Sequence, residues 1–398
     1  MTDVFDYLKW RGDLSFDEAP FCEIDALIFA EISYVDLGGI VDGPRRGTQP
    51  VTLRQAAEKF FVIHDESTYS MGVIVPNGIL MMLRQAAQTR RFADVTVSDY
   101  VSRTDDAEAT QFSAVAFSFA HGKYAIAYRG TDDSVAGWRE NFDMAFEMPV
   151  PAQICGAGYL DGFVGSHRIN TMYVCGHSKG GNLAVYSSAF CSDKARAKIT
   201  GTYNFDGPGF RSEFYDDGRF SRISAGLHTF VPESSIIGML LDIGYDYTVV
   251  RSSEKGIMQH DGLSWGVEGT HFISAEKLND TARHFDESFS KWLTELPDDQ
   301  RKETVDTIFS VIYRTESHTL TELAEKKELL GKALIALPAE KRKILIDMIR
   351  GIVMDNLGVF VDEVVKPKIA EIKIDIAEIA EKIAPKSKET NRNIHISK

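Results

Sequence analysis

The sequence predicts an α/β protein in which a mostly parallel β-sheet carries helices on both faces, followed by a region of helices only. Runs rich in β-branched and aromatic residues recur between residues 112 and 250, and from residue 156 helical stretches separate them. Such alternation is typical of a parallel sheet. After about residue 286 the strand-forming runs stop and charged helical segments continue. We therefore predict an α/β domain over residues 1–285 and a helical region over residues 286–398 that ends in a disordered tail.

The N-terminal part, up to about Tyr100, is predicted to consist of helices joined by loops. Apolar residues recur at helical spacing in Asp25–Val35, which indicates a helix with a buried face. The pentapeptide LRQAA occurs at Leu53–Ala57 and again at Leu83–Ala87. We interpret the two copies as similar helical turns, because nothing around them repeats.

The sheet is predicted from six strand-forming runs. Phe112–Phe119 and Lys123–Arg129 alternate in character on either side of Ala-His-Gly, which indicates a β-hairpin. The four later runs are Thr171–Cys175, Thr200–Phe205, Leu227–Val231 and Tyr245–Val250. The clearest of the intervening helices is expected over Asn182–Ala197, where apolar residues return to helical spacing.

The composition argues against several classes of function. A formal net charge of −14 over 398 residues disfavours a nucleic-acid partner, because phosphate binding needs a basic surface. The four cysteines are widely spaced and form no Cys-x-x-Cys pair, so we predict neither a zinc site nor a disulfide framework. No apolar run approaches the length of a transmembrane helix, and the N-terminus lacks the pattern of a secretion signal. A reducing, cytoplasmic location is the expectation.

Ser178 is the candidate nucleophile, because it stands at the centre of a Gly-x-Ser-x-Gly sequence between Gly176 and Gly180. A predicted strand ends just before it and a helix begins just after it, as a nucleophile elbow requires. Glycines allow the close approach of strand and helix at so tight a turn. The backbone N–H of Lys179, at the start of the helix, is a predicted oxyanion donor. The alternative is a structural or anion-binding turn, so the chemistry depends on the partners of the serine.

Three further segments precede this turn. A predicted strand ends in Arg129-Gly130-Thr131, Trp138 follows in the next loop, and the segment GYLDGF occupies residues 158–163. The same features occur in this order, ahead of Gly-His-Ser-x-Gly-Gly, in the class 3 lipases, which the sequence resembles from about Asp25 to Gly266. In detail the sequence is similar to an uncharacterised bacterial branch of lipase-like proteins.

The resemblance implies an α/β-hydrolase fold and the positions of further parts of a catalytic site. It implies that Thr131 contributes a second contact to the oxyanion, beside the N–H of Lys179. It also implies that Asp132–Pro151 occupies the place of the lid of class 3 lipases. No metal or organic cofactor is expected, since a serine hydrolase needs none.

His260 is the first candidate for the general base. In α/β-hydrolases the catalytic residues follow the chain order Ser, Asp or Glu, His, so the histidine must come late. His260 follows the last predicted strand in a loop that resembles the histidine loop of class 3 lipases, with Gly262 and Trp265 after it. His271 is the reserve candidate. The alternative is that His260 is an exposed loop histidine without a catalytic role.

The acid is where the sequence departs from the class 3 pattern. That family carries an aspartate after the strand that corresponds to Leu227–Val231, where this chain has Ser235, and a serine has no charge to stabilise an imidazolium. Asp206 is the first substitute, because its strand is expected beside the nucleophile strand and pancreatic-type lipases carry their aspartate there. Glu233 is the second substitute. The simpler role for Asp206 is to cap the turn at Gly207–Gly209.

These residues predict a serine esterase or lipase that forms an acyl-enzyme on Ser178. The predicted substrate is a small-molecule or lipid ester with apolar acyl groups. Aromatic residues and methionines between Phe142 and Met148 either line an acyl site or belong to an amphipathic helix packed on the core. The alternatives are a thioesterase or peptidase with the same triad, and a non-catalytic, lipase-like scaffold.

The C-terminal region is predicted to be helical, with one helix from Pro297 to about Tyr313 and another over Thr321–Ala336. Charges and apolar stripes alternate most clearly in Ile369–Ile383. We expect these helices to pack on the hydrolase or to associate with a second copy. Partner binding and peripheral contact with a membrane are the alternatives, the latter disfavoured by the mixed charge and the absence of Trp and Phe from this stretch.

Overall fold

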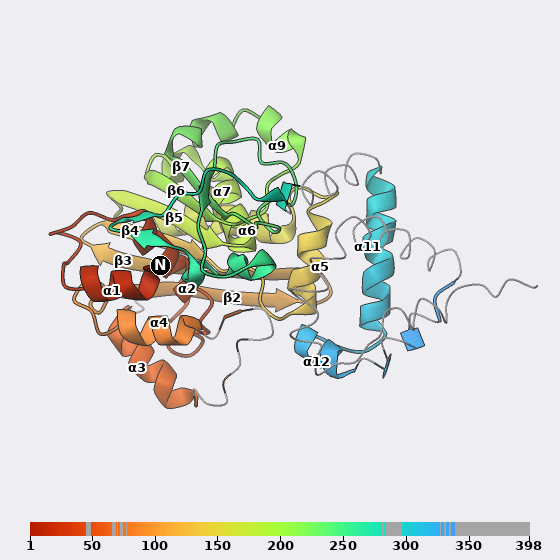
Figure 1. Ribbon diagram of the computed structural model, residues 1–398, viewed down its shortest axis with the longest axis horizontal. Coiled ribbons are helices and arrows are strands. Elements are labelled where there is room, and N and C mark those ends of the chain that lie inside the picture. The colour runs from red at the N-terminus through yellow and green to blue at the C-terminus, as the bar shows by residue number, and fades with distance from the viewer. Residues whose placement is uncertain are drawn as a thin grey trace, which may run out of the picture.

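The computed structural model describes residues 1–44, 49–65, 69, 71, 75–76, 78–280, 282–283, 297–326, 328–329, 332–333 and 336–338. The core is an eight-stranded sheet whose strands lie in the same order as in the chain (Figure 1). The strands are β1 (Val51–Thr52), β2 (Thr96–Asp105), β3 (Thr110–Ala120), β4 (Lys123–Tyr128), β5 (Thr171–His177), β6 (Ile199–Phe205), β7 (Leu227–Pro232) and β8 (Thr248–Val250). A small second sheet pairs β9 (Val267–Glu268) with β10 (His271–Phe272).

The direction of the strands divides the large sheet into two parts. The pairs from β1–β2 to β3–β4 are antiparallel, whereas β4 to β8 run parallel to one another. The carboxyl ends of β4 to β8 therefore open at one edge, where ligands and catalytic groups of open α/β sheets gather. The prediction of an α/β fold with a mostly parallel sheet is confirmed.

Helices cover both faces of the sheet (Figure 1). Their bounds are α1 (Val4–Arg11), α2 (Glu23–Ile32), α3 (Leu53–Ile63), α4 (Gly78–Ala86), α5 (Val135–Asp143), α6 (Pro151–Ser166), α7 (Lys179–Phe190), α8 (Asp193–Arg196), α9 (Ser212–Asp216), α11 (Asp298–Tyr313) and α12 (Leu320–Glu325). Helices α6 and α7 pack together, with α7 against β4 to β6, while α2 also packs against β4 to β6. The helices predicted around Asp25–Val35 and at both LRQAA segments are confirmed as α2, α3 and α4.

Alternate residues of the central strands build a separate core on each face. In β4, Ala125 and Ala127 belong to the core that contains α2, while Ile126 and Tyr128 belong to the core that contains residues of α6 and α7. Because side chains alternate along a strand, burial of both faces requires apolar or small residues at successive positions. This explains the apolar run in the sequence of β4.

A buried ion pair fixes the start of α2. The Asp25 carboxylate accepts hydrogen bonds from Arg91 Nε and Nη2 at 2.8 and 2.5 Å, and one from the Tyr7 hydroxyl at 2.8 Å. Both charged side chains are fully buried, so removing either one would leave an uncompensated charge in the interior. The pair holds α2, whose residue Glu31 lies with its Oε1 3.6 Å from Nδ1 of His177.

Two predicted elements differ in the structure. Strand β2 begins at Thr96, within the part that was predicted to hold only helices and loops. The alternation of its side chains between the two faces of the sheet is broken by a register shift between Ser98 and Val101, where Asp99 has a φ of 55°. The two-residue period of a strand is therefore not visible in the sequence. The helix predicted over Asn182–Ala197 is divided into α7 and α8.

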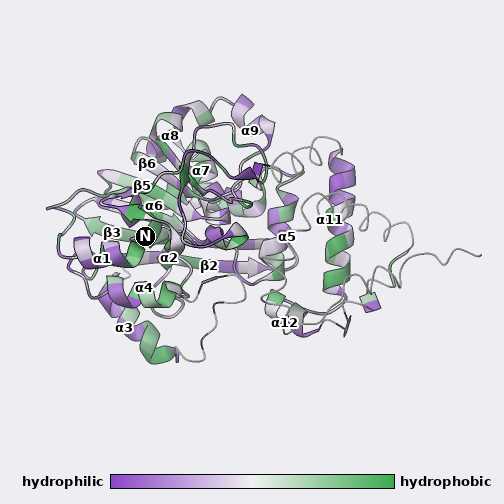
Figure 2. Ribbon diagram, in the orientation of Figure 1, coloured by the Kyte–Doolittle hydropathy of each residue, from purple (hydrophilic) through white to green (hydrophobic). Residues whose placement is uncertain are grey.

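The C-terminal helix α11 lies beside α5 (Figure 1). It contains both hydrophilic and hydrophobic residues (Figure 2), as an amphipathic helix does. The predicted helix from Pro297 to Tyr313 is confirmed, whereas the predicted domain boundary near residue 286 and the stretch Ile369–Ile383 lie outside the described residues. Within the described ranges, no helix has the length and apolar character needed to cross a membrane.

Candidate active site

Ser178 sits on a strained turn between β5 and α7. Its backbone has φ 57° and ψ −133°, a conformation that costs energy for any residue other than glycine. A Cβ on Gly176 would lie 2.1 Å from the carbonyl oxygen of Gly180, and a Cβ on Gly180 would lie 2.1 Å from that of Tyr128. Both positions therefore need glycine, because strand and helix approach too closely for a side chain. The geometry is that of a nucleophile elbow.

His260 and Asp206 are hydrogen bonded to each other. His260 ends a short 3₁₀ helix, η3 (Gly256–His260), and its Nδ1 lies 2.6 Å from Oδ2 of Asp206. Asp206 follows β6 directly and is fully buried. Its N–H donates to the Phe230 carbonyl oxygen at 2.8 Å. The carboxylate is thus held at the carboxyl edge of the sheet, facing the histidine.

Ser235 also contacts this carboxylate. The hydroxyl of Ser235 donates to Oδ1 of Asp206 at 2.5 Å, so Ser235, where the resemblance led us to expect an acid, supports the carboxylate that lies against His260. Glu233 lies in the same loop, and its backbone is hydrogen bonded to Val250 and to Asn279. Of the two candidate acids, Asp206 is the one that the structure brings to the histidine.

Hydrogen bonds join the elbow to the segments that carry this pair. The N–H of Ser178 donates to the carbonyl oxygen of Phe205 at 2.9 Å, and Phe205 immediately precedes Asp206. On the other side, Nε2 of His177 lies 2.8 Å from the carbonyl oxygen of His260, and the two imidazole rings are 4.5 Å apart between centroids. The three predicted triad residues therefore come from adjoining segments at one edge of the sheet.

A buried group of polar residues, Tyr34, Glu31 and His177, lies next to the loop that carries His260. Because a carbonyl only accepts, the Nε2 of His177 must donate to His260, and its Nδ1 then accepts from the Tyr34 hydroxyl at 3.1 Å. Burial holds the pKa of His177 well below its usual value, and the nearby His260 lowers it further. Burial, together with the charge of Asp261, raises the pKa of Glu31 well above its usual value. Both shifts disfavour an ion pair between Glu31 Oε1 and His177 Nδ1, which lie 3.6 Å apart.

The two predicted oxyanion groups lie on either side of the elbow. Lys179 begins α7, where the first backbone N–H groups have no partner within the helix. Thr131 comes three residues after Tyr128, which pairs with Gly176 in the parallel register of β4 and β5. The hydroxyl oxygen of Thr131 accepts from Asn141 Nδ2 at 2.7 Å, which leaves its proton available to donate.

The side chain of Lys179 points into the interior. Its Nζ donates to the carbonyl oxygen of Gln111 and to Oε2 of Glu140, both at 2.7 Å, and the lysine side chain is fully buried. Burial lowers the pKa of Lys179, and the charge of Glu140 opposes that shift. Only the backbone of Lys179 is available to the site, and its side chain instead joins α7 to α5.

The reserve histidine is not part of this arrangement. The side chain of His271 is 76% exposed, and its Nδ1 lies 3.4 Å from a carboxylate oxygen of Glu23. Sequence reasoning did not find the contacts of His177, Ser235 and Asn141. Two of these residues had a signal in their position, because His177 is part of the elbow motif and Ser235 stands where the class 3 acid was expected. Asn141 had no such signal.

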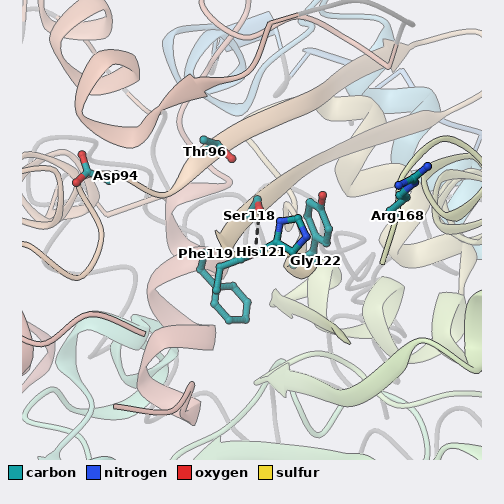
Figure 3. Close-up of a pocket in the computed structure, with 9 residues that line it drawn as sticks. Asp94, Thr96, Ser118, Phe119, His121, Gly122 and Arg168 are labelled. Carbon is teal, nitrogen blue, oxygen red and sulfur yellow. Dashed lines mark hydrogen bonds between the residues drawn. The ribbon is translucent and has the colours of Figure 1, made fainter. Parts of the chain in front are cut away.

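A cavity of about 310 Å³ lies elsewhere (Figure 3). Its lining residues are Asp94, Thr96, Ser118, Phe119, Ala120, His121, Gly122, Tyr124 and Arg168. These residues lie near the starts of β4 and β5, whereas Ser178 follows the end of β5. The cavity is therefore at the opposite edge of the sheet from Ser178, and it holds none of the predicted site residues.

Comparisons with known proteins place the chain in a family. No curated protein matches it. Among solved structures, the crystal structure of M37 lipase is similar, with 16% sequence identity and a TM-score of 0.33 over 55% of this chain and 68% of that chain. The family model described as Mbeg1-like matches residues 86–310. Because this match spans more than half of the sequence, the chain belongs to the Mbeg1-like family.

Proposed function

We propose that this protein is a serine hydrolase that cleaves carboxylic esters through an acyl-enzyme on Ser178. The observation that supports the proposal most is the 2.6 Å contact between the buried Asp206 carboxylate and Nδ1 of His260, beside a serine on a strained elbow. Such a contact holds a histidine in the tautomer that a general base requires. In this proposal Ser178 is the nucleophile, His260 the base and Asp206 the orienting acid.

The chemistry follows from the tautomer of His260. With Nδ1–H donating to Asp206, Nε2 is unprotonated and takes the proton of the Ser178 hydroxyl as its oxygen attacks the carbonyl carbon. The imidazolium that forms is stabilised by the Asp206 carboxylate, and it then protonates the departing alcohol. Water, activated by the same Nε2, attacks the acyl-enzyme and releases the acid.

The oxyanion that forms in each attack needs donors placed in advance. We assign the N–H of Lys179 and the hydroxyl of Thr131 to this role. The N-terminus of α7 supports the first, since its N–H groups and dipole favour negative charge. The hydrogen bond from Asn141 supports the second, because it occupies an acceptor site of Thr131 and directs the hydroxyl proton elsewhere.

The substrate class is the finer part of the proposal. We propose an ester with an apolar acyl group, of the lipase or esterase type, on the basis of the resemblance to class 3 lipases. Met144 lies in a buried cluster with Leu241, and the partly buried Phe146 packs against this cluster. Helix α5 ends at Asp143, so the stretch after it is a packed turn rather than a helix of its own. A reducing, cytoplasmic location belongs to the same proposal, supported by four cysteines that are all free.

A fluorophosphonate probe tests the nucleophile. We expect the wild-type protein to be labelled and Ser178→Ala to remain unlabelled, because the probe reacts only with an activated serine. His260→Ala should abolish labelling as well, whereas the matched variant His271→Ala, at an exposed histidine outside the site, should be labelled like the wild type. Labelling that persists in Ser178→Ala would disprove the assignment of the nucleophile.

Turnover tests the substrate class. p-Nitrophenyl esters of increasing acyl length should show hydrolysis that depends on Ser178, and the preferred length separates an esterase from a lipase. Labelling of Ser178 by the fluorophosphonate without hydrolysis of any ester would favour a thioester or peptide substrate. Absence of labelling in a folded wild-type protein would favour the non-catalytic scaffold.

A further inference from the structure

Helix α5 connects three parts of the molecule through three consecutive side chains. Arg139 Nη2 donates to Asp306 of α11 at 2.5 Å, Glu140 accepts from Lys179 of α7 at 2.7 Å, and Asn141 donates to Thr131 at 2.7 Å. Successive residues of a helix point about 100° apart, so one short helix faces the C-terminal region, the elbow and the predicted oxyanion group at once.

The inner contact of α5 is buried and hydrogen bonded. Glu140 is almost completely buried, and both of its carboxylate oxygens have donors. Oε2 accepts from the N–H of Gln111 at 3.1 Å as well as from Lys179, and Oε1 accepts from the N–H of Ala152 at 2.8 Å. A buried carboxylate with donors on both oxygens resists displacement. The position of α5 is therefore tied to the position of α7, the helix that follows Ser178.

The outer contact of α5 is made by α11. Val135 of α5 forms a buried cluster with Val305 and Phe309 of α11, and the rings of Phe142 and Phe309 lie 5.8 Å apart. The segment that holds the place of a class 3 lid is thus covered on this side by another part of the same chain.

The start of α12 and the residues just before it hold the loop that carries Thr131. The N–H of Val135 donates to the carbonyl oxygen of His318, and the N–H of Leu320 donates to that of Asp133, both at 2.8 Å. The hydroxyl of Thr321 adds a bond to Oδ2 of Asp133 at 2.6 Å. Residues 133–135 are consequently fixed from outside, only two residues after the predicted oxyanion group.

We propose that residues 298–326 position the oxyanion side of the active site, by holding α5 and the loop before it so that Thr131 faces the acyl carbonyl. The inference rests on the proposed function, since it gives the C-terminal helices a role in that reaction. Asn141, Asp306 and Leu320 are positioning residues in this scheme. The segment in the place of the lid then acts as a clamped support, and detaching the C-terminal helices lowers the rate of acylation without removing any group of the triad.

One backbone hydrogen bond offers a sharp test. Leu320 is the first residue of α12, and its N–H donates to Asp133 rather than within the helix. Proline is well accepted at this position of a helix, and Thr319 before it is already extended, with φ −128° and ψ 158°, as a residue before proline should be. Leu320→Pro therefore removes the bond to Asp133 while α12 is kept. Leu320→Ala is the matched control, since it shortens the side chain and retains the N–H.

The rate of acylation and local hydrogen exchange are measured in the full-length chain. In Leu320→Pro we expect kcat and the rate of fluorophosphonate labelling to fall about tenfold or more, because small displacements of oxyanion donors are costly. KM should stay within about twofold, and amides of residues 131–143 should exchange faster. Leu320→Ala should behave like the wild type in all of these measurements.

The outcomes separate this inference from the proposed function. Normal labelling and unchanged exchange in Leu320→Pro would overturn the positioning role while the hydrolase assignment stands. A wild-type protein that is never labelled would refute the hydrolase. In that case the exchange measurement still tests the C-terminal region. Faster amide exchange over residues 131–143 in Leu320→Pro, but not in Leu320→Ala, would show that residues 298–326 hold this segment, and unchanged exchange would overturn that role.

Discussion

Asp206→Asn tests the proposed acid with the smallest change in shape. The wild-type carboxylate receives two donors, His260 Nδ1–H on Oδ2 and the Ser235 hydroxyl on Oδ1. An amide offers one oxygen and one NH₂ group, so one of the two partners must change. If Ser235 turns its oxygen to the NH₂ group, the tautomer of His260 is kept and only the charge is lost. If His260 accepts from the NH₂ group, its Nε2 becomes protonated and ceases to be a base.

The expected loss follows from these two arrangements. Two unit charges about 4 Å apart attract by about 4 kcal/mol at an effective dielectric constant of about 20, and this energy corresponds to a factor of about 10³ in rate. The inverted tautomer costs about 10⁴ in the best-studied serine protease triad. We therefore expect Asp206→Asn to lower kcat by about 10³ to 10⁴.

Initial rates of ester hydrolysis and the rate of fluorophosphonate labelling measure this loss. Glu233→Gln is the matched control, because it neutralises the other candidate acid in the neighbouring loop, and it should stay within about threefold of the wild type. Thermal unfolding of both variants checks that the fold is intact. Asp206→Asn with nearly full activity, or a larger loss in Glu233→Gln, would refute the assignment of the acid.

Three further changes test other contacts. Ser235→Ala leaves a buried oxygen of Asp206 without its donor, so we expect a loss of about 1–3 kcal/mol in unfolding free energy and a lower kcat; unchanged values in denaturant titrations and ester assays would count against this. Glu31 has a raised pKa in the folded protein, so its contribution to stability falls as the pH rises above the unfolded value of about 4.3. The advantage of Glu31→Gln over the wild type should accordingly grow between pH 5 and pH 8, and an equal difference at both pH values in urea titrations would contradict that sign. Lys179→Met leaves Glu140 charged and buried, which we expect to cost about 3–5 kcal/mol, whereas the double variant with Glu140→Gln should recover much of it in the same titration; equal losses in both would show that the ion pair is not the cause.

The sequence predicted those parts of the site that depend on local backbone geometry. A turn that needs glycine at 176 and 180 shows in the residue types themselves, and the strand and helix around Ser178 have clear periods. Strand β2 was missed because Asp99 interrupts its alternation. The direction of the Lys179 side chain had no signal at all, since it depends on Glu140, which is distant in the sequence and reaches the lysine only through packing.

The contact between Ser235 and Asp206 has a consequence for related chains. The ends of β6 and β7 approach so closely that side chains from both share one hydrogen bond. Two carboxylates at this separation do not both ionise, and the pKa of one would rise strongly. The two positions should therefore exclude each other: a chain with aspartate after β7 is expected to carry a neutral residue after β6, and the reverse. A serine at position 235 is then no reason to classify such a protein as a pseudoenzyme, because the missing charge has an alternative place one strand away.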